Sequence, residues 1–282
     1  MARILLAGCG AIGTQLGEAL QAAGHEVFGL RRSAVAMPFP TLHADLTQPL
    51  PADLLPAQLD YVVHTGTPAQ RSDSGYEAGY PRALRHLLAA LAPATSTASL
   101  KRFFFVSSTA VYHQDDGSWV DETSPTRPTR FNGIRVLEAE NVLRQSGVAG
   151  TCVRFGGIYG AGRNGLMRRV QAGAEVQVAP AKYTNRIHQD DCAGVLHYLI
   201  NEQEQGRPLQ PVYLAVDDDP ADESTLCSWL ADRLGAPAPV TTSPGGHMGQ
   251  NKRCSNRLLR TQGYRFIYPT FREGYAAQCK VD

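Results

Sequence analysis

The stretch Ala7-Gly8-Cys9-Gly10-Ala11-Ile12-Gly13 decides the fold of the first half of the chain. It follows the short apolar run of residues 3–7, which is typical of a buried parallel strand, and precedes Leu16, Leu20 and Ala23 at helical spacing. A glycine-rich turn between a strand and a helix lets the backbone approach a pyrophosphate, to which the helix presents free N–H groups. The spacing predicts a dinucleotide site rather than a turn without a ligand. Its candidate residues are Gly8, Gly10, Ala11, Ile12 and Gly13, of which the last is expected to pack the helix on the strand.

Short β-branched or aromatic runs alternate with longer helical patterns over the first half of the chain. Strands are predicted at residues 27–30, 59–63, 101–106 and 152–155, and helices at residues 84–91 and 136–143. This alternation implies βαβ crossovers and a parallel sheet covered on both faces. The predicted fold is α/β, a Rossmann-type doubly wound parallel sheet with a small C-terminal substrate-binding lobe.

The composition of the sequence changes after residue 155, where five glycines fall within ten residues. A helix at residues 191–200, a strand at 212–216 and a helix at 223–234 are predicted next, and residues 235–249 are rich in Pro and Gly, which indicates a surface loop. We expect residues 1–155 to form the dinucleotide-binding domain, with a later contribution from about residues 186–216. Residues 156–282 are then mainly the substrate lobe, over the carboxyl ends of the strands, where open α/β sheets bind ligands.

The composition excludes several classes of protein. Lys and Arg number 27 against 26 Asp and Glu, so no global field attracts nucleic acid or an anionic membrane. The six cysteines form no C-x-x-C pair and indicate free buried thiols in a reducing cytosol, and the eight histidines show no metal-ligand spacing. No apolar run approaches the ~20 residues that span a bilayer, and the chain enters a strand directly after its start. We therefore expect a cytoplasmic protein without a metal, whose partner is a small molecule.

The residues after the second predicted strand bear on which dinucleotide binds. Many dinucleotide sites have an acidic residue there that holds the adenosine ribose hydroxyls, but this chain has Arg31-Arg32-Ser33. A carboxylate repels a 2′-phosphate, whereas guanidinium groups and a hydroxyl bind it. The charges favour NADP over NAD as the cofactor, with two solvated arginines at a strand exit as the alternative.

Five further motifs extend over most of the chain. They are Ala44-Asp45-Leu46, His64-Thr65-Gly66, Ser107-Ser108-Thr109-Ala110-Val111-Tyr112, Gly157-Ile158-Tyr159-Gly160 and Asn185-Arg186-Ile187-His188-Gln189-Asp190-Asp191. Together with the glycine loop they resemble the extended branch of the short-chain dehydrogenase/reductase superfamily, the NAD(P)-dependent epimerase/dehydratase-like proteins. The resemblance implies that Asp45 and Leu46 lie beside the adenine, and that His64, Thr65 and Gly66 lie along the cofactor.

Two features point to an atypical subgroup of that superfamily. Ala7 stands where the extended branch usually has its first glycine, so the chain keeps the older dinucleotide-binding spacing. The runs at residues 252–259 and 263–269 are similar to those of proteins known as nucleoside-diphosphate-sugar epimerase-like.

The catalytic pair of the superfamily, Tyr-x-x-x-Lys, is absent. Aligned on the Pro-rich approach at residues 124–128, the pair becomes Phe131 and Arg135, still at the i and i+4 spacing that shares one helix face. A tyrosine acts as general acid or base when nearby cations lower its pKa, whereas Phe131 has no proton to exchange. Arg135 can bond a ribose hydroxyl but does not deprotonate near neutral pH. Ser108 remains at the serine position of the superfamily, where it can orient a carbonyl or simply end a strand.

Several other side chains are candidates for the missing chemistry. Tyr112, Tyr159 and Tyr183 each have a hydroxyl on a segment expected near the cleft, although ordinary packing explains them as well. Arg154, Arg163 and Arg186 suit a substrate phosphate or carboxylate, or structural pairing with nearby acids. His188 is a candidate base or a brace between the lobes.

The sequence therefore predicts an NADP-dependent enzyme of the epimerase/dehydratase-like group, acting on a small polar or nucleotide-linked substrate. Ser108 and Tyr112 are the candidates for positioning the reacting group. The rival hypothesis, favoured by the missing Tyr and Lys, is a non-catalytic protein that senses the redox state of NADP or recruits a partner. The helices at about residues 82–91 and 133–145 lie where relatives dimerise, which leaves room for a homodimer.

Overall fold

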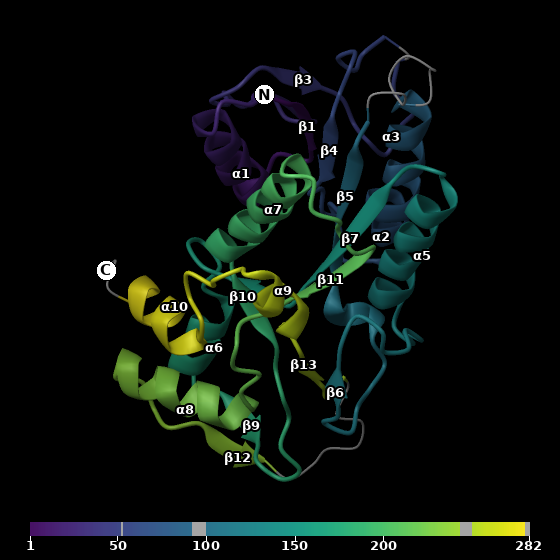
Figure 1. Ribbon diagram of the computed structural model, residues 1–282. Coiled ribbons are helices and arrows are strands. Elements are labelled where there is room, and N and C mark those ends of the chain that lie inside the picture. Colours follow the sequence, from purple (N-terminus) through teal and green to yellow (C-terminus); the bar gives the residue numbers. More distant parts are fainter. Residues whose placement is uncertain (52, 92–99, 243–249, 280–282) are drawn as a thin grey trace. The chain divides into compact units, whose positions relative to one another are not determined.

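The computed structural model describes residues 1–51, 53–91, 100–242 and 250–279 and divides into two compact units (Figure 1). The first unit comprises Met1–Val111, Thr126–Arg154 and Ala193–Tyr213. The second unit comprises Tyr112–Pro125, Phe155–Cys192 and Leu214–Asp282. Each unit thus draws on three separate segments of the chain.

A seven-stranded sheet draws its strands from both halves of the chain. Its spatial order is β11 (Val212–Ala215), β7 (Gly150–Phe155), β5 (Arg102–Ser108), β4 (Tyr61–His64), β1 (Arg3–Ala7), β2 (Glu26–Arg31) and β3 (Thr41–His43). The strands run parallel, with Ala7 of β1 level with Leu30 of β2 and with His64 of β4. Aligned carboxyl ends bring the glycine loop and the loop after β4 to one edge of the sheet. The predicted doubly wound α/β fold is confirmed.

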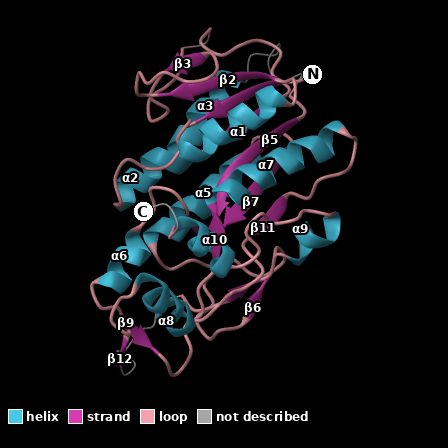
Figure 2. Ribbon diagram, turned by 90° about the vertical axis from the view of Figure 1, so that its left-hand side faces the viewer, coloured by secondary structure: helices cyan, strands magenta, loops and turns pink. Residues whose placement is uncertain are grey.

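Helices cover both faces of this sheet (Figures 1 and 2). They are α1 (Ala11–Ala22), α2 (Asp73–Glu77), the π-helical turn η1 (Ala78–Arg82), α3 (Ala83–Leu91), α5 (Phe131–Gln145) and α7 (Gln189–Glu204). The central strands β1, β4 and β5 are apolar on both faces, and Leu5, Val62 and Phe104 on them are fully buried. That burial is what a parallel sheet between two helical layers requires.

The second unit is built from short pieces. Its strands form parallel pairs, β8 (Gly157–Tyr159) with β10 (Arg186–His188), β9 (Glu175–Gln177) with β12 (Val240–Thr242), and β6 (Trp119–Val120) with β13 (Arg253–Cys254). Its helices are α6 (Gly165–Gln171), α8 (Glu223–Leu234), α9 (Arg257–Gln262) and α10 (Phe271–Gln278). An apolar core that includes Val170, Leu230 and Phe271 holds α6, α8 and α10 together.

Local signals explain where these elements begin and end. The Asp222 side chain accepts a hydrogen bond from the Thr225 amide at the start of α8, and Gly235 ends that helix at φ +59°. The prediction of a surface loop over residues 235–249 is wrong for residues 240–242, because these residues form the strand β12, which pairs with β9. Residues 243–249 of that prediction lie outside the described residues.

All six cysteines are free, and five of them are buried. Burial raises the pKa of the Cys9 thiol to about 11. Over the described residues, no helix is long and apolar enough to cross a membrane.

Candidate dinucleotide site

Gly8 brings the glycine loop against the loop that follows β4. Its backbone has φ +94°, and a Cβ built there lies 2.4 Å from both the N and the Cα of Gly66. The Gly8 amide donates to the Leu30 carbonyl of β2 at 2.8 Å. Only glycine satisfies both the positive φ and the close approach. The tight turn predicted at Gly8 is therefore present at the carboxyl end of β1.

The N-terminus of α1 is bare. Gly10 is the N-cap residue, and within the described chain no side chain caps the helix and no acidic residue lies in its first turn. A Cβ at Gly10 meets nothing within 4 Å among the described atoms. The amides of Ala11, Ile12 and Gly13 open the helix at this point. Uncapped amides beside open backbone are the features that a pyrophosphate group needs.

Gly13 faces the loop after β4 rather than the neighbouring strand. A Cβ on Gly13 lies 2.9 Å from Thr65 Oγ1, and the Thr65 hydroxyl donates to the Gly8 carbonyl at 2.8 Å. The close approach of α1 to the sheet is made one turn later at Gly17, where a Cβ lies 2.1 Å from Phe39 and 3.0 Å from Leu6. Thr65 thus links the two loops of the site, a role that the sequence pattern does not reveal.

Arg31 and Ser33 bond to each other at the end of β2. The Arg31 Nε and Nη2 atoms donate to Ser33 Oγ at 3.2 and 2.9 Å, and its Nη1 atom contacts the Met37 sulfur. The Arg32 side chain is 66 % exposed and lies 3.7 Å from an Asp45 carboxylate oxygen. Two guanidinium groups and a hydroxyl therefore lie at the end of β2. The guanidinium of Arg31 is held by Ser33, whereas that of Arg32 is mostly exposed.

Asp45 and Leu46 hold the adjacent turn. Asp45 Oδ1 accepts hydrogen bonds from the Thr47 amide at 2.9 Å and the Thr47 hydroxyl at 2.8 Å. These bonds, the amide first, hold the pKa of Asp45 below its usual value despite partial burial. The Leu46 carbonyl lies 2.9 Å from His86 Nδ1. Asp45 is thus an ionised turn residue beside Arg32.

His64 ends β4 inside the core. Its side chain is fully buried, its ring packs against Phe105 at 5.6 Å, and neither ring nitrogen has a partner among the described residues. Burial lowers the pKa of His64 to about 4, so the ring is neutral. A Cβ on Gly66 lies 3.2 Å from the ring, so His64 supports the loop that meets Gly8.

The serines at the end of β5 differ in what they contact. Ser107 Oγ donates to Glu140 Oε1 at 2.5 Å, and Arg154 donates to both oxygens of Glu140 at 2.9 and 2.7 Å. This buried network ties β5, α5 and β7 together, and it favours structural pairing over substrate binding for Arg154. Ser108 is half-buried and accepts from the Ala110 amide at 3.1 Å, as a strand-end hydroxyl does.

Phe131 and Arg135 lie on α5, on the segment expected to replace the Tyr-x-x-x-Lys pair. Phe131 is 39 % exposed, and its ring meets the Tyr76 ring edge-on at 5.4 Å. Arg135 binds Asp73 with two parallel hydrogen bonds of 2.7 and 2.9 Å and donates to Glu138 at 3.0 Å. The guanidinium therefore clamps α2 to α5. Its expected bond to a ribose hydroxyl stays a prediction.

The candidate tyrosines of the second unit are packed. Tyr112 is fully buried and its hydroxyl donates to the Asp121 carbonyl at 2.7 Å. Tyr159 stacks on Tyr275 at 4.4 Å, and the Arg253 guanidinium lies 4.7 Å from the Tyr183 ring. These contacts favour the packing interpretation of all three hydroxyl side chains, and the catalytic role of Tyr112 stays a prediction.

The charged candidates of the second unit have mixed environments. His188 is buried, which lowers its pKa, and its Nδ1 atom accepts from the Asp190 amide at 3.2 Å. Arg186 is 5 % exposed and lies 5.6 Å over the Phe271 ring. Burial raises the pKa of the neighbouring Asp217 to about 8, and its Oδ2 atom has no partner among the described residues. None of the described residues form a group of three or more His, Cys, Asp or Glu suited to a metal ion.

Three residues that the structure makes prominent have little or no signal in the sequence. Glu140 anchors the buried network, Asp73 holds Arg135, and Lys252 is 4 % exposed. Glu140 has a weak signal, since it stands on the apolar side of an amphipathic pattern. Nothing in the sequence indicates the other two, because their contacts or their burial depend on segments far away in the chain.

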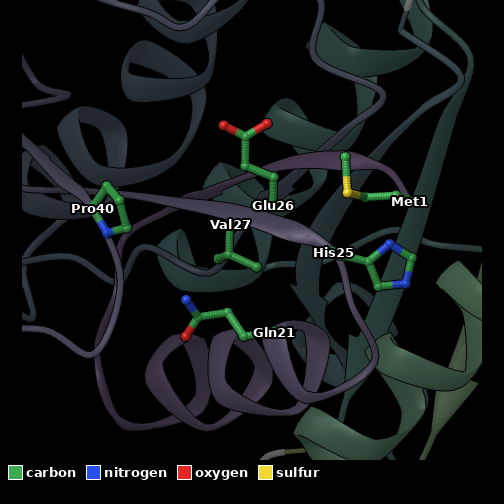
Figure 3. A pocket seen from close by; sticks show the side chains of 6 residues that line it. All are labelled: Met1, Gln21, His25, Glu26, Val27 and Pro40. Atoms are coloured by element: carbon green, nitrogen blue, oxygen red, sulfur yellow. The ribbon is translucent and has the colours of Figure 1, made fainter.

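A hollow of about 340 Å³ lies beside the start of β2 (Figure 3). It is lined by Met1, Gln21, His25, Glu26, Val27 and Pro40. Glu26 begins β2, whereas Arg31 at the other end of that strand marks the carboxyl edge. Ligands of open α/β sheets bind at the carboxyl edge, so this hollow is not the dinucleotide site.

Known proteins resemble this chain over nearly its whole length. A 38 % identical protein of Methylobacillus flagellatus, provisionally assigned as an NAD-dependent epimerase/dehydratase, superposes with a TM-score of 0.80 over 98 % of this chain and 97 % of that one. The 3-diazoavenalumate denitrifying reductase of a Streptomyces species is 28 % identical over 267 residues, 85 % of this chain and 84 % of that protein. The dTDP-glucose 4,6-dehydratase of Streptomyces venezuelae, solved with NAD, is 20 % identical and shares the fold with a TM-score of 0.76 over 99 % and 96 % of the two chains.

A family model accounts for most of the sequence. The model of the NAD dependent epimerase/dehydratase family matches residues 4–213, which include the glycine loop, β4, β5 and α5. The chain therefore belongs to the NAD-dependent epimerase/dehydratase family.

Proposed function

We propose that the chain is an NADP-dependent oxidoreductase that transfers a hydride to or from a small polar or nucleotide-linked substrate. The observation that carries the proposal is the uncapped N-terminus of α1 beside the open backbone of Gly10. A dinucleotide pyrophosphate fits those amides, and the family of the chain is named for its dependence on NAD. When bound, the nicotinamide supplies or accepts the hydride.

Different residues of the first unit would bind the pyrophosphate and the 2′-phosphate of this cofactor. Gly10, Ala11 and Ile12 offer backbone amides to the pyrophosphate. Arg32, with the bonded pair Arg31 and Ser33, offers donors to a 2′-phosphate at the end of β2. The ionised Asp45 opposes the negative charge of a 2′-phosphate, but the guanidinium groups of Arg31 and Arg32 bring two positive charges to the same strand exit.

The absence of a tyrosine at position 131 bears on which class of hydride acceptor the site can use. Phe131 exchanges no proton, and Arg135 is held by Asp73 and Glu138. Interconversion of an alcohol and a ketone needs a group that moves the hydroxyl proton. Hydride addition to a diazonium carbon forms a C–H bond and expels N₂, and it needs no such group. One relative is named a denitrifying reductase of a diazo compound. A hydride acceptor of this kind therefore suits the site better than a sugar alcohol.

The cofactor preference is tested by the dissociation constants of NADP⁺ and NAD⁺. We expect tighter binding of NADP⁺, and loss of roughly tenfold in its affinity on Arg32→Ala, with NAD⁺ binding unchanged. Arg3→Ala is the matched control, because Arg3 pairs with Glu26 at the opposite edge of the sheet. Equal affinities for the two cofactors would remove the NADP assignment.

Turnover is tested by single-turnover absorbance of the reduced nicotinamide. The panel comprises sugar nucleotides, aldehydes, ketones and a diazo compound. A hydride transfer that is unaffected by Phe131→Tyr supports chemistry without a side-chain proton donor. Tight cofactor binding with silence over the whole panel would favour a second function, an NADP-binding sensor, which the replacement of both catalytic residues by Phe131 and Arg135 also favours.

A further inference from the structure

Lys252 is a buried lysine in the second unit. It directly precedes β13, which pairs with β6, and only 4 % of its surface is exposed. Its carbonyl accepts from Asn185 Nδ2 at 2.9 Å. The preceding residue, Asn251, is fixed on both sides, since its amide donates to the Gln114 carbonyl at 3.1 Å and its carbonyl accepts from the Gly117 amide at 2.8 Å. The backbone therefore holds Lys252 in place.

The Lys252 ammonium has no counter-charge among the described residues. Its Nζ atom donates to Gln250 Oε1 at 2.9 Å, and no described carboxylate lies within 4.0 Å of it. Lys101 and Lys182, by contrast, both pair with carboxylates. An ammonium has three N–H donors, so two of those on Lys252 lack an acceptor in the described part of the chain. Burial lowers the pKa of Lys252, as expected for a desolvated cation.

Nearby groups are arranged around this single charge. Gln250 Nε2 donates to the Tyr112 carbonyl at 2.6 Å, which fixes the amide so that its oxygen faces Lys252. The neighbouring Arg253 does not add to the charge, because its guanidinium lies over the Trp119 ring at 5.1 Å and its Nε atom donates to the Gly117 carbonyl. One buried positive charge with free donors remains.

We propose that Lys252 binds the carboxylate of a substrate in the second unit. An unpaired buried ammonium is costly, and a ligand that brings a negative charge and two acceptor oxygens removes that cost. A single cation matches a monoanion, whereas a phosphate dianion would leave a buried charge uncompensated. The role of the ligand as substrate rests on the proposed function, but carboxylate binding at Lys252 does not.

The test measures the thermal unfolding temperature with saturating NADP⁺ and a panel of acetate, benzoate and cinnamate. The neutral amides of the same acids and inorganic phosphate are the comparison probes. We expect at least one carboxylate to raise Tm by about 5 °C at 100 times its dissociation constant, and its amide and phosphate to have no effect. Lys252→Met should abolish the shift and leave Tm without ligand unchanged or higher. Lys182→Met, which removes a paired lysine of the same unit, should keep the shift.

Four results would overturn the proposal, and the first three concern the carboxylates and Lys252→Met. They are an absence of any carboxylate shift in the unaltered protein, an equal shift in Lys252→Met, and a fall of several degrees in the Tm of ligand-free Lys252→Met, which would show a structural role. A larger shift with phosphate than with every carboxylate would also contradict it. Hydride transfer is recorded separately, so carboxylate binding without turnover leaves this inference standing while the proposed function fails. Turnover without carboxylate binding would support the proposed function and contradict carboxylate binding at Lys252.

Discussion

Substitution of Gly8 separates the two physical constraints on the glycine loop. Gly8→Ala places a Cβ at φ +94° and 2.4 Å from the backbone of Gly66. The left-handed backbone costs an alanine about 1–2 kcal/mol. The contact is with main-chain atoms, which have no rotamer to change, so overpacking adds about 1–3 kcal/mol. The free energy of unfolding should therefore fall by about 2–5 kcal/mol, or Tm by roughly 5–15 °C.

Two other glycines provide matched controls. Gly24 has φ +85° with nothing within 4 Å of its Cβ position, so Gly24→Ala should cost only the backbone term of about 1–2 kcal/mol. Gly10 is equally open and its φ is −87°, so Gly10→Ala should cost less than about 1 kcal/mol. Gly10→Ala should nevertheless weaken NADP⁺ binding, because its methyl group occupies the space that a pyrophosphate needs.

The assay is urea unfolding of the three variants together with NADP⁺ titration by calorimetry. An equal destabilisation by Gly8→Ala and Gly24→Ala would refute the close approach of the two loops. Wild-type affinity in Gly10→Ala would refute the placement of the pyrophosphate at the N-terminus of α1.

Three further predictions concern buried or clamped charges. Glu140→Gln removes the carboxylate that pairs with the buried Arg154 and should cost about 3–5 kcal/mol in urea unfolding, unlike the exposed Glu18→Gln. Since the pKa of Asp217 is raised to about 8, the native state keeps a proton that the unfolded chain loses above about pH 4. As the pH rises from 4 to 8, the free energy of unfolding should therefore fall by up to ~1.4 kcal/mol per pH unit, and Asp217→Asn should abolish this slope. Asp73→Asn should raise hydrogen exchange in α2, and unchanged exchange would contradict the clamp.

The sequence predicts the core of the fold because its signals there are local. The strand at residues 3–7, the glycine turn and the helix after it each follow from the spacing of neighbouring residues. The short elements β3 and β12 have three residues each, too few for a period to appear. They exist because a neighbouring strand offers hydrogen bonds, as β9 does to β12. Pairing between distant segments was therefore the part of the fold that the sequence could not reveal.

The same limit applies to the candidate site. The glycine loop and the replacement of the Tyr-x-x-x-Lys pair can be recognised from the sequence, because each is a pattern of neighbouring residues. The engagement of Arg135 is not, since Asp73 stands 62 positions earlier in the chain. Thr65 likewise reaches Gly8 across 57 positions. Which donors remain available for a ligand is decided by such long-range contacts, and only the structure gives them.

Burial alone does not distinguish a structural charge from one that awaits a ligand. Arg154 is 3 % exposed and Lys252 is 4 % exposed, so desolvation is similar for both. Arg154 meets both oxygens of Glu140, whereas Lys252 meets one neutral amide oxygen. A buried cation whose donors are satisfied within the chain fixes the packing of strands and helices. A buried cation that is left with free donors departs from the rule that buried charges are paired, and such departures concentrate where a protein binds something else. The partner of each charge, rather than its depth, therefore assigns Arg154 to the scaffold and Lys252 to the ligand.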